Sequence, residues 1–407
     1  MYLARTLEKS IQKVSDFFPV LLVTGPRQVG KTTILQACGS KGRNYISLDT
    51  LENRSLAQND PALFLQRFKA PLLIDEIQYA PQLFPYIKAA VDEQKQSGMY
   101  WLTGSQQFHL MKNVSESLAG RVGILHLEGF SQAERDGQPE RRLFLPTPKA
   151  IEARAAFAPK TDIEAVFHQI WKGSYPRMHE ADDDMWQFFY DAYVQTYIER
   201  DIRDLGSVGN ELDFLKFMKV LAARTGQLLN YSDIARDVGI SAPTVKAWVS
   251  LLQTSGLIFI LQPYHNNINS RVIKTPKVYF MDTGLVCYLT GWNAPQTLEN
   301  CAMSGELLET YVISEIVKSW WHNGKQPNIY YYRDKDRREI DVILEENGVL
   351  YPIEVKKKSN PNAGDIKAFD AIETVLKQKR GHGAVLCMAR THLPITAEVD
   401  AVPISYI

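Results

Sequence analysis

The residues best suited to chemistry form a loop, Gly25-Pro26-Arg27-Gln28-Val29-Gly30-Lys31-Thr32, between the apolar run Val20–Val23 and a predicted helix that begins near Thr33. Glycines let a backbone curl so that its N–H groups point at phosphate oxygens, and a helix start adds its positive dipole end. The lysine of such a loop reaches the outer phosphates of a nucleotide, and the next hydroxyl ligates Mg²⁺. We therefore expect Gly25–Thr33 to bind ATP with Mg²⁺, with Lys31 on the phosphates and Thr32 on the metal.

Further polar residues stand at the ends of two predicted strands. Asp75 and Glu76 follow the apolar run Leu72–Ile74. We expect Asp75 to ligate Mg²⁺, directly or through water, and Glu76 to polarise the attacking water. Thr103 and Ser105 end the next strand, and of these two hydroxyls we expect Ser105 to sense the γ-phosphate.

Arg121 lies at the end of a predicted helix, just before the fifth predicted strand. This is a suitable place for an arginine finger that completes the site of a neighbouring subunit. A solvated surface arginine is the alternative. An arginine finger acting on a neighbour predicts self-association into a ring or another oligomer.

A second constellation lies near the C-terminus. Asp341 is within the predicted strand 339–344, and Glu354 and Lys356 are on the next strand. Residues two apart in a strand share a face, so Glu354 and Lys356 point the same way and Asp341 can join them. The carboxylates of Asp341 and Glu354 would hold Mg²⁺, and Lys356 would orient or deprotonate a water. Glu309, on the predicted helix 305–321, is a further acid.

The segment from Tyr231 to Val249 has the pattern of a helix-turn-helix, with Gly239 at the turn and Ser241 capping the second helix. The predicted strand 257–261 adds a wing. DNA contact and a structural or protein-binding role both stay open, because the second helix presents only one charged residue. The candidate DNA contacts are Thr244, Lys246 and Ser250 on that helix and Arg271, Lys274 and Lys277 after it.

The elements that position these residues fall into three stretches. Five short apolar strands alternate with helices over the first third of the chain, which predicts a doubly wound α/β sheet. These strands are expected at 20–23, 45–48, 71–74, 100–103 and 124–127. Residues 134–160 look like a surface connection. The pattern is then helical from 162 to 256 and returns to mixed α/β for the last hundred residues.

Bulk composition sets the remaining limits. A chain of 407 residues is too long for one hydrophobic core, so two to four domains are expected. The 46 basic and 46 acidic residues give no net charge, and hence no overall sign of a nucleic-acid binder. The four cysteines form no C-x-x-C pair, which argues against a zinc ribbon. Without a signal peptide or an apolar span, we expect a cytoplasmic chain with no membrane segment.

The motifs GPRQVGKTT, LIDEIQ and LTGSQ resemble those of bacterial and archaeal AAA+-type ATPases that end in a nuclease-like domain. This resemblance implies four parts. They are an AAA+ P-loop ATPase domain at 1–160, a helical lid at 161–209, a winged helix-turn-helix at 210–295 and a PD-(D/E)xK nuclease-like domain at 296–407.

The resemblance also implies two residue roles. Glu309 takes the place of the helix glutamate of the nuclease-like fold, whereas Ile340 stands where that fold usually has a proline. Gly173-Ser174-Tyr175-Pro176 is similar to an element that touches the adenine side of the ATP site, which makes Pro176 a nucleotide contact. A helix-breaking turn is the alternative for Pro176.

Three functions are compatible with these features. The first is a Mg²⁺-dependent ATPase that acts on DNA by binding, remodelling or cleaving it. The second is a DNA-remodelling ATPase, of the branch-migration type, whose nuclease-like domain only binds DNA. The third is a regulatory ATPase with a protein partner. Basic residues at Lys356–Lys358 and 333–338 would track a phosphate backbone, although charge runs are also commonly solvated faces.

Overall fold

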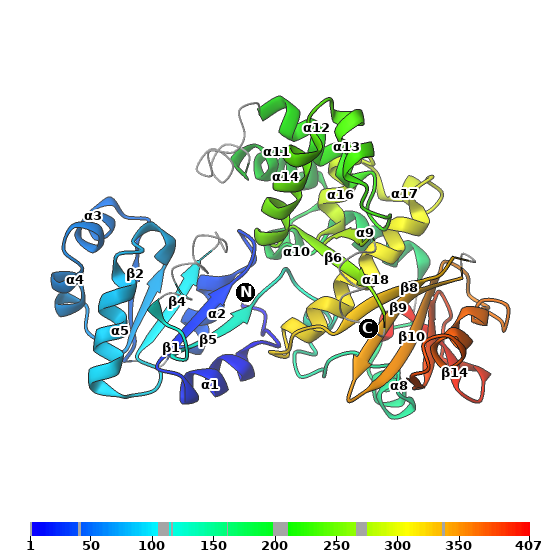
Figure 1. Ribbon diagram of the computed structural model, residues 1–407, viewed down its shortest axis with the longest axis horizontal. Coiled ribbons are helices and arrows are strands. Elements are labelled where there is room, and N and C mark those ends of the chain that lie inside the picture. The colour runs from blue at the N-terminus through cyan, green and yellow to red at the C-terminus, as the bar shows by residue number, and fades with distance from the viewer. Residues whose placement is uncertain are drawn as a thin grey trace. The chain divides into compact units, whose positions relative to one another are not determined.

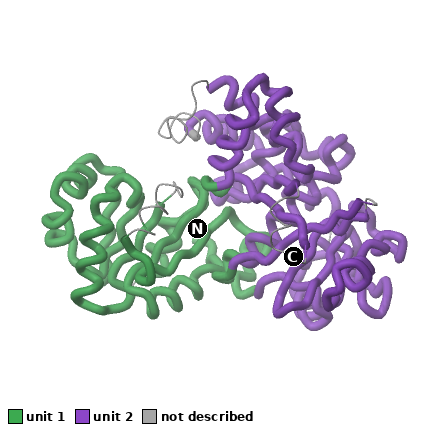
Figure 2. The backbone as a smooth tube through the Cα atoms, in the orientation of Figure 1, with its two compact units in different colours: residues 1–141, 254–256, 321–325 green, residues 142–253, 257–320, 326–407 purple. Residues whose placement is uncertain are grey.

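The computed structural model describes residues 2–39, 42–104, 114, 117–160, 162–197, 211–265, 275–335 and 338–407. The chain divides into two compact units (Figure 2). Unit 1 comprises residues 1–141, 254–256 and 321–325, and unit 2 comprises residues 142–253, 257–320 and 326–407. Among the described residues, no helix is long and apolar enough to cross a bilayer.

Unit 1 is built on a sheet of five parallel strands in the order β2-β3-β4-β1-β5 (Figure 1). The strands are β1 (Val20–Thr24), β2 (Asn44–Ser47), β3 (Leu72–Asp75), β4 (Tyr100–Gly104) and β5 (Val122–His126). The parallel arrangement confirms the expectation from the alternating pattern. It also brings the carboxyl ends of β1, β3 and β4 to one edge of the sheet, with β4 between the other two.

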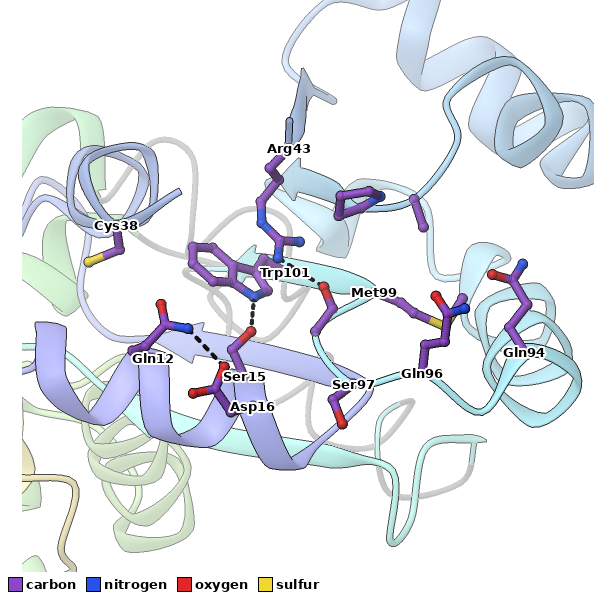
Figure 3. Close-up of a pocket in the computed structure, with 13 residues that line it drawn as sticks. Gln12, Ser15, Asp16, Cys38, Arg43, Gln94, Gln96, Ser97, Met99 and Trp101 are labelled. Atoms are coloured by element: carbon purple, nitrogen blue, oxygen red, sulfur yellow. Dashed lines mark hydrogen bonds between the residues drawn. The ribbon is translucent and has the colours of Figure 1, made fainter. Parts of the chain in front are cut away.

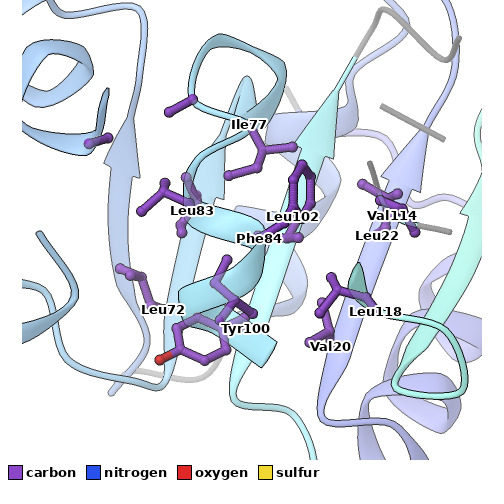
Figure 4. Close-up of a cluster of buried hydrophobic side chains, with 14 of the residues drawn as sticks. Val20, Leu22, Leu72, Ile77, Leu83, Phe84, Tyr100, Leu102, Val114 and Leu118 are labelled. Atoms are coloured by element: carbon purple, nitrogen blue, oxygen red, sulfur yellow. The ribbon is translucent and has the colours of Figure 1, made fainter. Parts of the chain in front are cut away.

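Helices and a continuous apolar core support this sheet. The helical elements of unit 1 are α1 (Glu8–Phe17), α2 (Lys31–Cys38), α3 (Leu51–Asn59), α4 (Pro61–Arg67), η1 (Ile77–Tyr79), α5 (Leu83–Gln94) and α7 (Gln132–Arg135). Figure 4 shows part of the core, in which Leu102 from β4 lies near Phe84 from α5, and Leu22 from β1 lies beside Val114. Such packing of both sheet faces explains why the strands read as unbroken apolar runs.

Unit 2 begins with helices. They are α8 (Pro148–Ala155), α9 (Ile163–Lys172), α10 (Pro176–Glu180), η2 (Asp183–Met185), α11 (Trp186–Tyr197), α12 (Glu211–Ala222), α13 (Tyr231–Val238) and α14 (Ala242–Thr254). The expectation of a plain surface connection at 134–160 is wrong at α8. There Ile151 is buried, and the buried guanidinium of Arg154 donates to the carbonyl oxygens of Arg142 and Tyr406 at 2.6 Å each.

The turn between α13 and α14 follows its sequence closely. Gly239 has φ 89°, a left-handed conformation that glycine adopts without strain. Ser241 Oγ then accepts from Thr244 N at 3.2 Å and caps α14. Val245 and Trp248 bury one face of α14, whereas Lys246 is exposed.

A nine-stranded sheet forms the second half of unit 2, in the order β13-β14-β12-β10-β9-β8-β6-β7, with β11 also paired to β10. Strand β6 (Ile258–Pro263) pairs antiparallel with β7 (Lys277–Phe280) and parallel with β8 (Ile329–Arg333) (Figure 1). The sheet therefore runs without a break from the helix-turn segment into the C-terminal part.

The remaining elements complete this sheet and its helices. The strands are β9 (Glu339–Glu346), β10 (Val349–Lys356), β11 (Lys379–Arg380), β12 (Gly383–Cys387), β13 (Leu393–Thr396) and β14 (Val399–Pro403). The helical elements are α16 (Thr283–Thr290), α17 (Pro295–Leu298), α18 (Ser304–Trp321), η4 (Lys367–Asp370), α19 (Ala371–Thr374) and η5 (Ile404–Tyr406). These elements agree with the mixed α/β pattern expected for the last hundred residues.

Candidate functional site

The loop between β1 and α2 has the backbone that its glycines predict. Gly25 has φ 144° and Gly30 has φ 93°, both in the region that favours glycine. A Cβ atom at Gly25 would lie 1.9 Å from the carbonyl oxygen of Leu127, which leaves no room for a side chain. The loop sits at the carboxyl edge of the sheet, where parallel α/β folds bind ligands.

Lys31 is buried inside this loop. Its Nζ donates to the carbonyl oxygens of Gly25 at 3.1 Å and Pro26 at 2.6 Å. Burial lowers the pKa of Lys31 to about 8, although the nearby charge of Glu76 acts in the opposite direction. A buried ammonium held by neutral carbonyls is well suited to a stronger, anionic acceptor, so these residues fit the phosphates of ATP.

Asp75 joins the loop to two neighbouring strands. Its Oδ1 accepts from Thr32 Oγ1 at 2.7 Å and from Thr103 Oγ1 at 2.5 Å, and its Oδ2 accepts from Tyr45 OH at 3.2 Å. The two residues expected to hold Mg²⁺, Thr32 and Asp75, are therefore in direct contact. Mg²⁺ is commonly held by one or two protein groups together with phosphates and water, and this pair fits that requirement.

Glu76 stands next to this pair in a left-handed conformation with φ 57°. Its backbone N–H donates to Thr103 Oγ1 at 3.0 Å, and its carboxylate accepts from the Gln78 amide. Thr103 thus contacts both acidic residues. The sequence favours Ser105 as the hydroxyl that senses the γ-phosphate, but Ser105 lies outside the described residues. Of the two candidate hydroxyls, the structure describes Thr103.

Arg121 is held within its own subunit. Its guanidinium makes two contacts with the Asp92 carboxylate, at 2.5 Å and 2.9 Å, and donates to the Ala119 carbonyl oxygen at 3.1 Å. Arg121 directly precedes β5, so it lies at the amino edge of the parallel sheet, opposite the loop. Its role as a finger for a neighbouring subunit stays a prediction, and it requires the pair with Asp92 to open.

Arg5, which the sequence does not single out, contacts the backbone of the loop at Val29. Its guanidinium donates to the carbonyl oxygens of Val29 at 2.9 Å and Glu128 at 2.7 Å, and it pairs with buried Glu134 at 3.1 Å. Burial acts to raise the pKa of Glu134, but the charges of Arg5 and His322 hold it well below its usual range. No local pattern marks Arg5, because its partners are distant in sequence.

A cavity of unit 1 lies at the amino edge of the sheet (Figure 3). Its volume is about 470 Å³. There Arg43 lies 4.0 Å above the Trp101 ring, and Trp101 Nε1 donates to Ser15 Oγ at 2.8 Å. This cavity is separate from the loop motifs, which all lie at the carboxyl edge.

The C-terminal constellation also assembles. Lys356 Nζ lies 2.6 Å from Glu354 Oε2 and 3.5 Å from Asp341 Oδ2, and Val355 N donates to Asp341 Oδ2 at 2.9 Å. Burial, and then the charge of Asp341, raise the pKa of Glu354 to about 9. Two carboxylates that repel each other in this way fit a shared cation, which would remove the repulsion.

Glu309 is engaged by residues from β7. Its Oε1 accepts from Tyr279 OH at 2.5 Å and from Lys277 Nζ at 3.2 Å. Lys277 also lies 2.6 Å from Glu339 Oε1. The sequence suggests Lys277 as a contact to DNA phosphates, but in the structure its side chain points toward the acidic residues Glu309 and Glu339. Arg271 and Lys274 lie outside the described residues.

A cavity of about 550 Å³ in unit 2 is lined by Lys277, Glu309, Glu339, Asp341 and Lys356, among others, and Glu354 lies beside it next to Val355. Within the described part of the chain, no group of three or more His, Cys, Asp and Glu side chains is placed to hold a metal ion. A cation in this cavity would therefore use the two carboxylates of Asp341 and Glu354 and take its other ligands from substrate and water.

Two further candidates have evident structural roles. Pro176 is the first residue of α10, and the preceding Ser174 donates through N and Oγ to Asp282 Oδ2 at 2.6 Å and 2.9 Å. The basic run after Lys356 is also paired, since Lys357 donates to the Glu299 carbonyl and Lys358 lies 2.6 Å from Asp365. A nucleotide contact by Pro176 stays a prediction.

The parallel sheet with its phosphate-binding loop defines unit 1 as a P-loop ATPase-type domain. Consistent with this class, residues 18–135 match the family model described as "AAA domain". Residues 163–296 and 304–407 match models described as domains of unknown function, DUF8612 and DUF4143. Winged-helix and nuclease-like identities for unit 2 therefore remain proposals.

Relatives extend over most of the chain. The "uncharacterized protein Rv2008c" of Mycobacterium tuberculosis is 27% identical over 387 residues, 95% of this chain and 80% of the relative. Among solved structures, a Walker-type ATPase of Pyrococcus abyssi is 16% identical, with a TM-score of 0.43 over 71% of this chain and 96% of that chain. RuvB of Thermotoga maritima is 20% identical, with a TM-score of 0.29 over 62% of this chain and 85% of that chain.

Proposed function

We propose that this chain hydrolyses ATP in a Mg²⁺-dependent reaction. The observation that carries this proposal is the contact of Asp75 with Thr32 from the loop and Thr103 from β4. In this reading Lys31 neutralises phosphate charge, Thr32 and Asp75 hold Mg²⁺, and Glu76 orients and polarises the attacking water. Mg²⁺ would supply charge neutralisation on the phosphates when bound.

The proposal extends to DNA as the object of this activity. Support comes from unit 2, where Asp341, Glu354 and Lys356 meet at the edge of a cavity that Arg333 also lines. Asp341 and Glu354 are suited to hold a divalent cation. Burial acts to lower the pKa of Lys356, but the charges of Asp341 and Glu354 raise it, so its ammonium is suited to orient an attacking water by donating to it. The capped α13–α14 pair and the β6–β7 hairpin have the order of a winged helix-turn-helix, a second candidate DNA surface.

The ATPase part is tested by Mg²⁺-dependent phosphate release. Lys31→Ala should abolish activity, because it removes the buried ammonium that the structure places within the loop, against the carbonyl oxygens of Gly25 and Pro26. Lys9→Ala is the control, since Lys9 is an exposed lysine of unit 1 whose Nζ lies 3.3 Å from Glu140 Oε2. Phosphate release by Lys31→Ala at the rate of the unsubstituted chain would refute this half.

The DNA part is tested on linear, branched and single-stranded DNA with Mg²⁺ or Mn²⁺. Cleavage should disappear in Asp341→Ala and in Lys356→Ala, whereas DNA binding should persist. Cleavage that survives both substitutions would end the catalytic assignment. Because phosphate contacts weaken steeply with salt, binding is compared at low and moderate salt.

A second candidate is an ATPase that remodels DNA without cutting it. It is favoured by the lysine pairing of Glu309 and Glu354, which gives these acids internal partners. Salt-sensitive DNA binding, with strand displacement and no cleavage, would select it.

A regulatory ATPase with a protein partner is the third candidate. It is favoured by the single charged residue, Lys246, among the candidate DNA contacts on α14. DNA binding that is absent at low salt would select this third candidate.

A further inference from the structure

Lys277 belongs to β7, yet its side chain ends inside the acidic cavity of unit 2. Only 6% of the side chain is exposed. Its Nζ lies 2.6 Å from Glu339 Oε1 and 3.2 Å from Glu309 Oε1, so a single ammonium bridges two carboxylates from different elements. Burial acts to lower the pKa of Lys277, but the charges of Glu309, Glu339 and Asp341 raise it, so the side chain carries a positive charge.

The backbone fixes Lys277 in this position. Lys277 pairs with Leu261 in the β6–β7 ladder and forms a bridge with Leu228 on its other side. Its neighbour along the same strand face, Tyr279, donates to the same oxygen of Glu309. The ammonium is therefore tethered by a strand that is held on both edges.

Lys356, the other lysine of the cavity, is placed differently. Its side chain is 34% exposed and stands at the end of β10, between Glu354 at 2.6 Å and Asp341 at 3.5 Å. It can turn toward solvent and leave these two carboxylates to a cation. Lys277 has no comparable exit, because it is almost completely enclosed.

The cavity brings four carboxylates and three basic side chains together. Its charged lining residues are Glu306, Glu309, Glu339, Asp341, Lys277, Arg333 and Lys356. Carboxylates crowded in this way are held together in proteins by metal ions or by buried cationic side chains. Lys277 supplies one such cation permanently, on the Glu309–Glu339 side, and leaves the Asp341–Glu354 side for an exchangeable ion.

We propose that the Lys277 ammonium takes the place of a second divalent cation, so that the cavity binds one divalent ion, at Asp341 and Glu354. This inference rests on the proposed metal-dependent function of the same cavity. It gives Glu309 a defined role, as a positioning residue that anchors Lys277. It also makes β7 part of the site, although the sequence motif lies entirely in β9 and β10.

The test counts Mn²⁺ ions bound by the full-length chain without nucleotide, by electron paramagnetic resonance of free Mn²⁺. A Thr32→Ala background removes the metal-binding hydroxyl of the ATP site. The parent should bind one Mn²⁺, which Asp341→Asn abolishes. Lys277→Met should bind two, because it removes the ammonium that bridges Glu309 and Glu339 and leaves Glu339 with the longer contact to Arg333, at 3.6 Å. Lys277→Gln provides a second, polar replacement in case the methionine variant does not fold.

Lys318→Met is the matched control. Lys318 is also a buried lysine, and it pairs with Glu315 at 3.0 Å on α18, away from the lining of the cavity. Its removal should leave the count at one. Thermal melting gives an independent readout, since Mn²⁺ should raise the melting temperature of Lys277→Met more than that of the parent or of Lys318→Met.

The outcomes separate the inference from the proposed function. One ion in both the parent and Lys277→Met, lost in Asp341→Asn, would overturn the inference and leave the metal site intact. Two ions in the parent would also overturn it, because Lys277 would not exclude the second. No ion dependent on Asp341 in either protein would refute the metal site itself, and the inference with it.

Discussion

Thr103 offers the sharpest test of the ATP site, because one hydroxyl serves both acidic residues. It donates to Asp75 Oδ1 at 2.5 Å and accepts from the Glu76 backbone N–H at 3.0 Å. Thr103→Val removes the hydroxyl and keeps the shape of the side chain. Asp75 then loses a donor that fixes its orientation, and the Glu76 backbone loses the acceptor that holds its left-handed turn.

The expected loss can be worked from these contacts. A hydrogen bond to a charged group contributes about 1.5–3 kcal/mol, which corresponds to about a 10- to 150-fold decrease in kcat if the contact is needed in the transition state. Nucleotide affinity should change less than about threefold, because Thr103 lies on β4 and not on the phosphate loop.

The assay pairs steady-state phosphate release with equilibrium binding of a fluorescent ATP analogue. Thr103→Ser is the control, since it keeps the hydroxyl and removes only a methyl group. The reasoning is refuted if Thr103→Val retains the kcat of the unsubstituted chain, or if Thr103→Ser loses as much activity as Thr103→Val. A parallel loss of nucleotide binding would instead indicate that β4 shapes the loop.

Two further predictions concern a titration and a buried acceptor. Burial lowers the pKa of Lys31 to about 8, so ATP affinity should be full below that pH and should fall as pH rises through it, by up to about tenfold per pH unit. Calorimetry should show that the protein takes up a proton when ATP binds near pH 8. Lys31→Arg should lack this pH dependence. The Asp282 carboxylate accepts hydrogen bonds from Ser174 N, Ser174 Oγ, Tyr190 OH and Leu285 N, so Asp282→Ala should lower the free energy of unfolding by about 3 kcal/mol or more. Urea unfolding measures this change. If Asp282→Ala lowers the free energy of unfolding no more than Asp282→Asn does, the prediction is contradicted.

Local sequence carried enough information to predict the ATP-binding loop. Gly25, Gly30 and Lys31 act within one turn of chain, so their spacing alone indicates their geometry. The same holds for Glu354 and Lys356, which share a strand face because they are two residues apart. The β3 strand also ended at Asp75 as its apolar run predicted.

Contacts between elements that are distant in the chain could not be predicted from the sequence. The role of Thr103 depends on β4 lying between β1 and β3, a strand order that no local pattern encodes. Lys277 on β7 and Glu309 on α18 are 32 residues apart, so their contact depends on how a strand and a helix pack in three dimensions. Arg5 meets Glu134 for the same reason, through tertiary packing.

The pairing of β6 with β8 has a practical consequence for dissecting this chain. A fragment that begins after α17 would lose β6 and expose the edge of β8, leaving unpaired backbone groups beside the apolar residues of the sheet. Such edges favour aggregation between copies. The C-terminal region should therefore be expressed together with the residues from α12 onward, and failure of a shorter fragment to stay in solution would reflect a severed sheet rather than an unstable site.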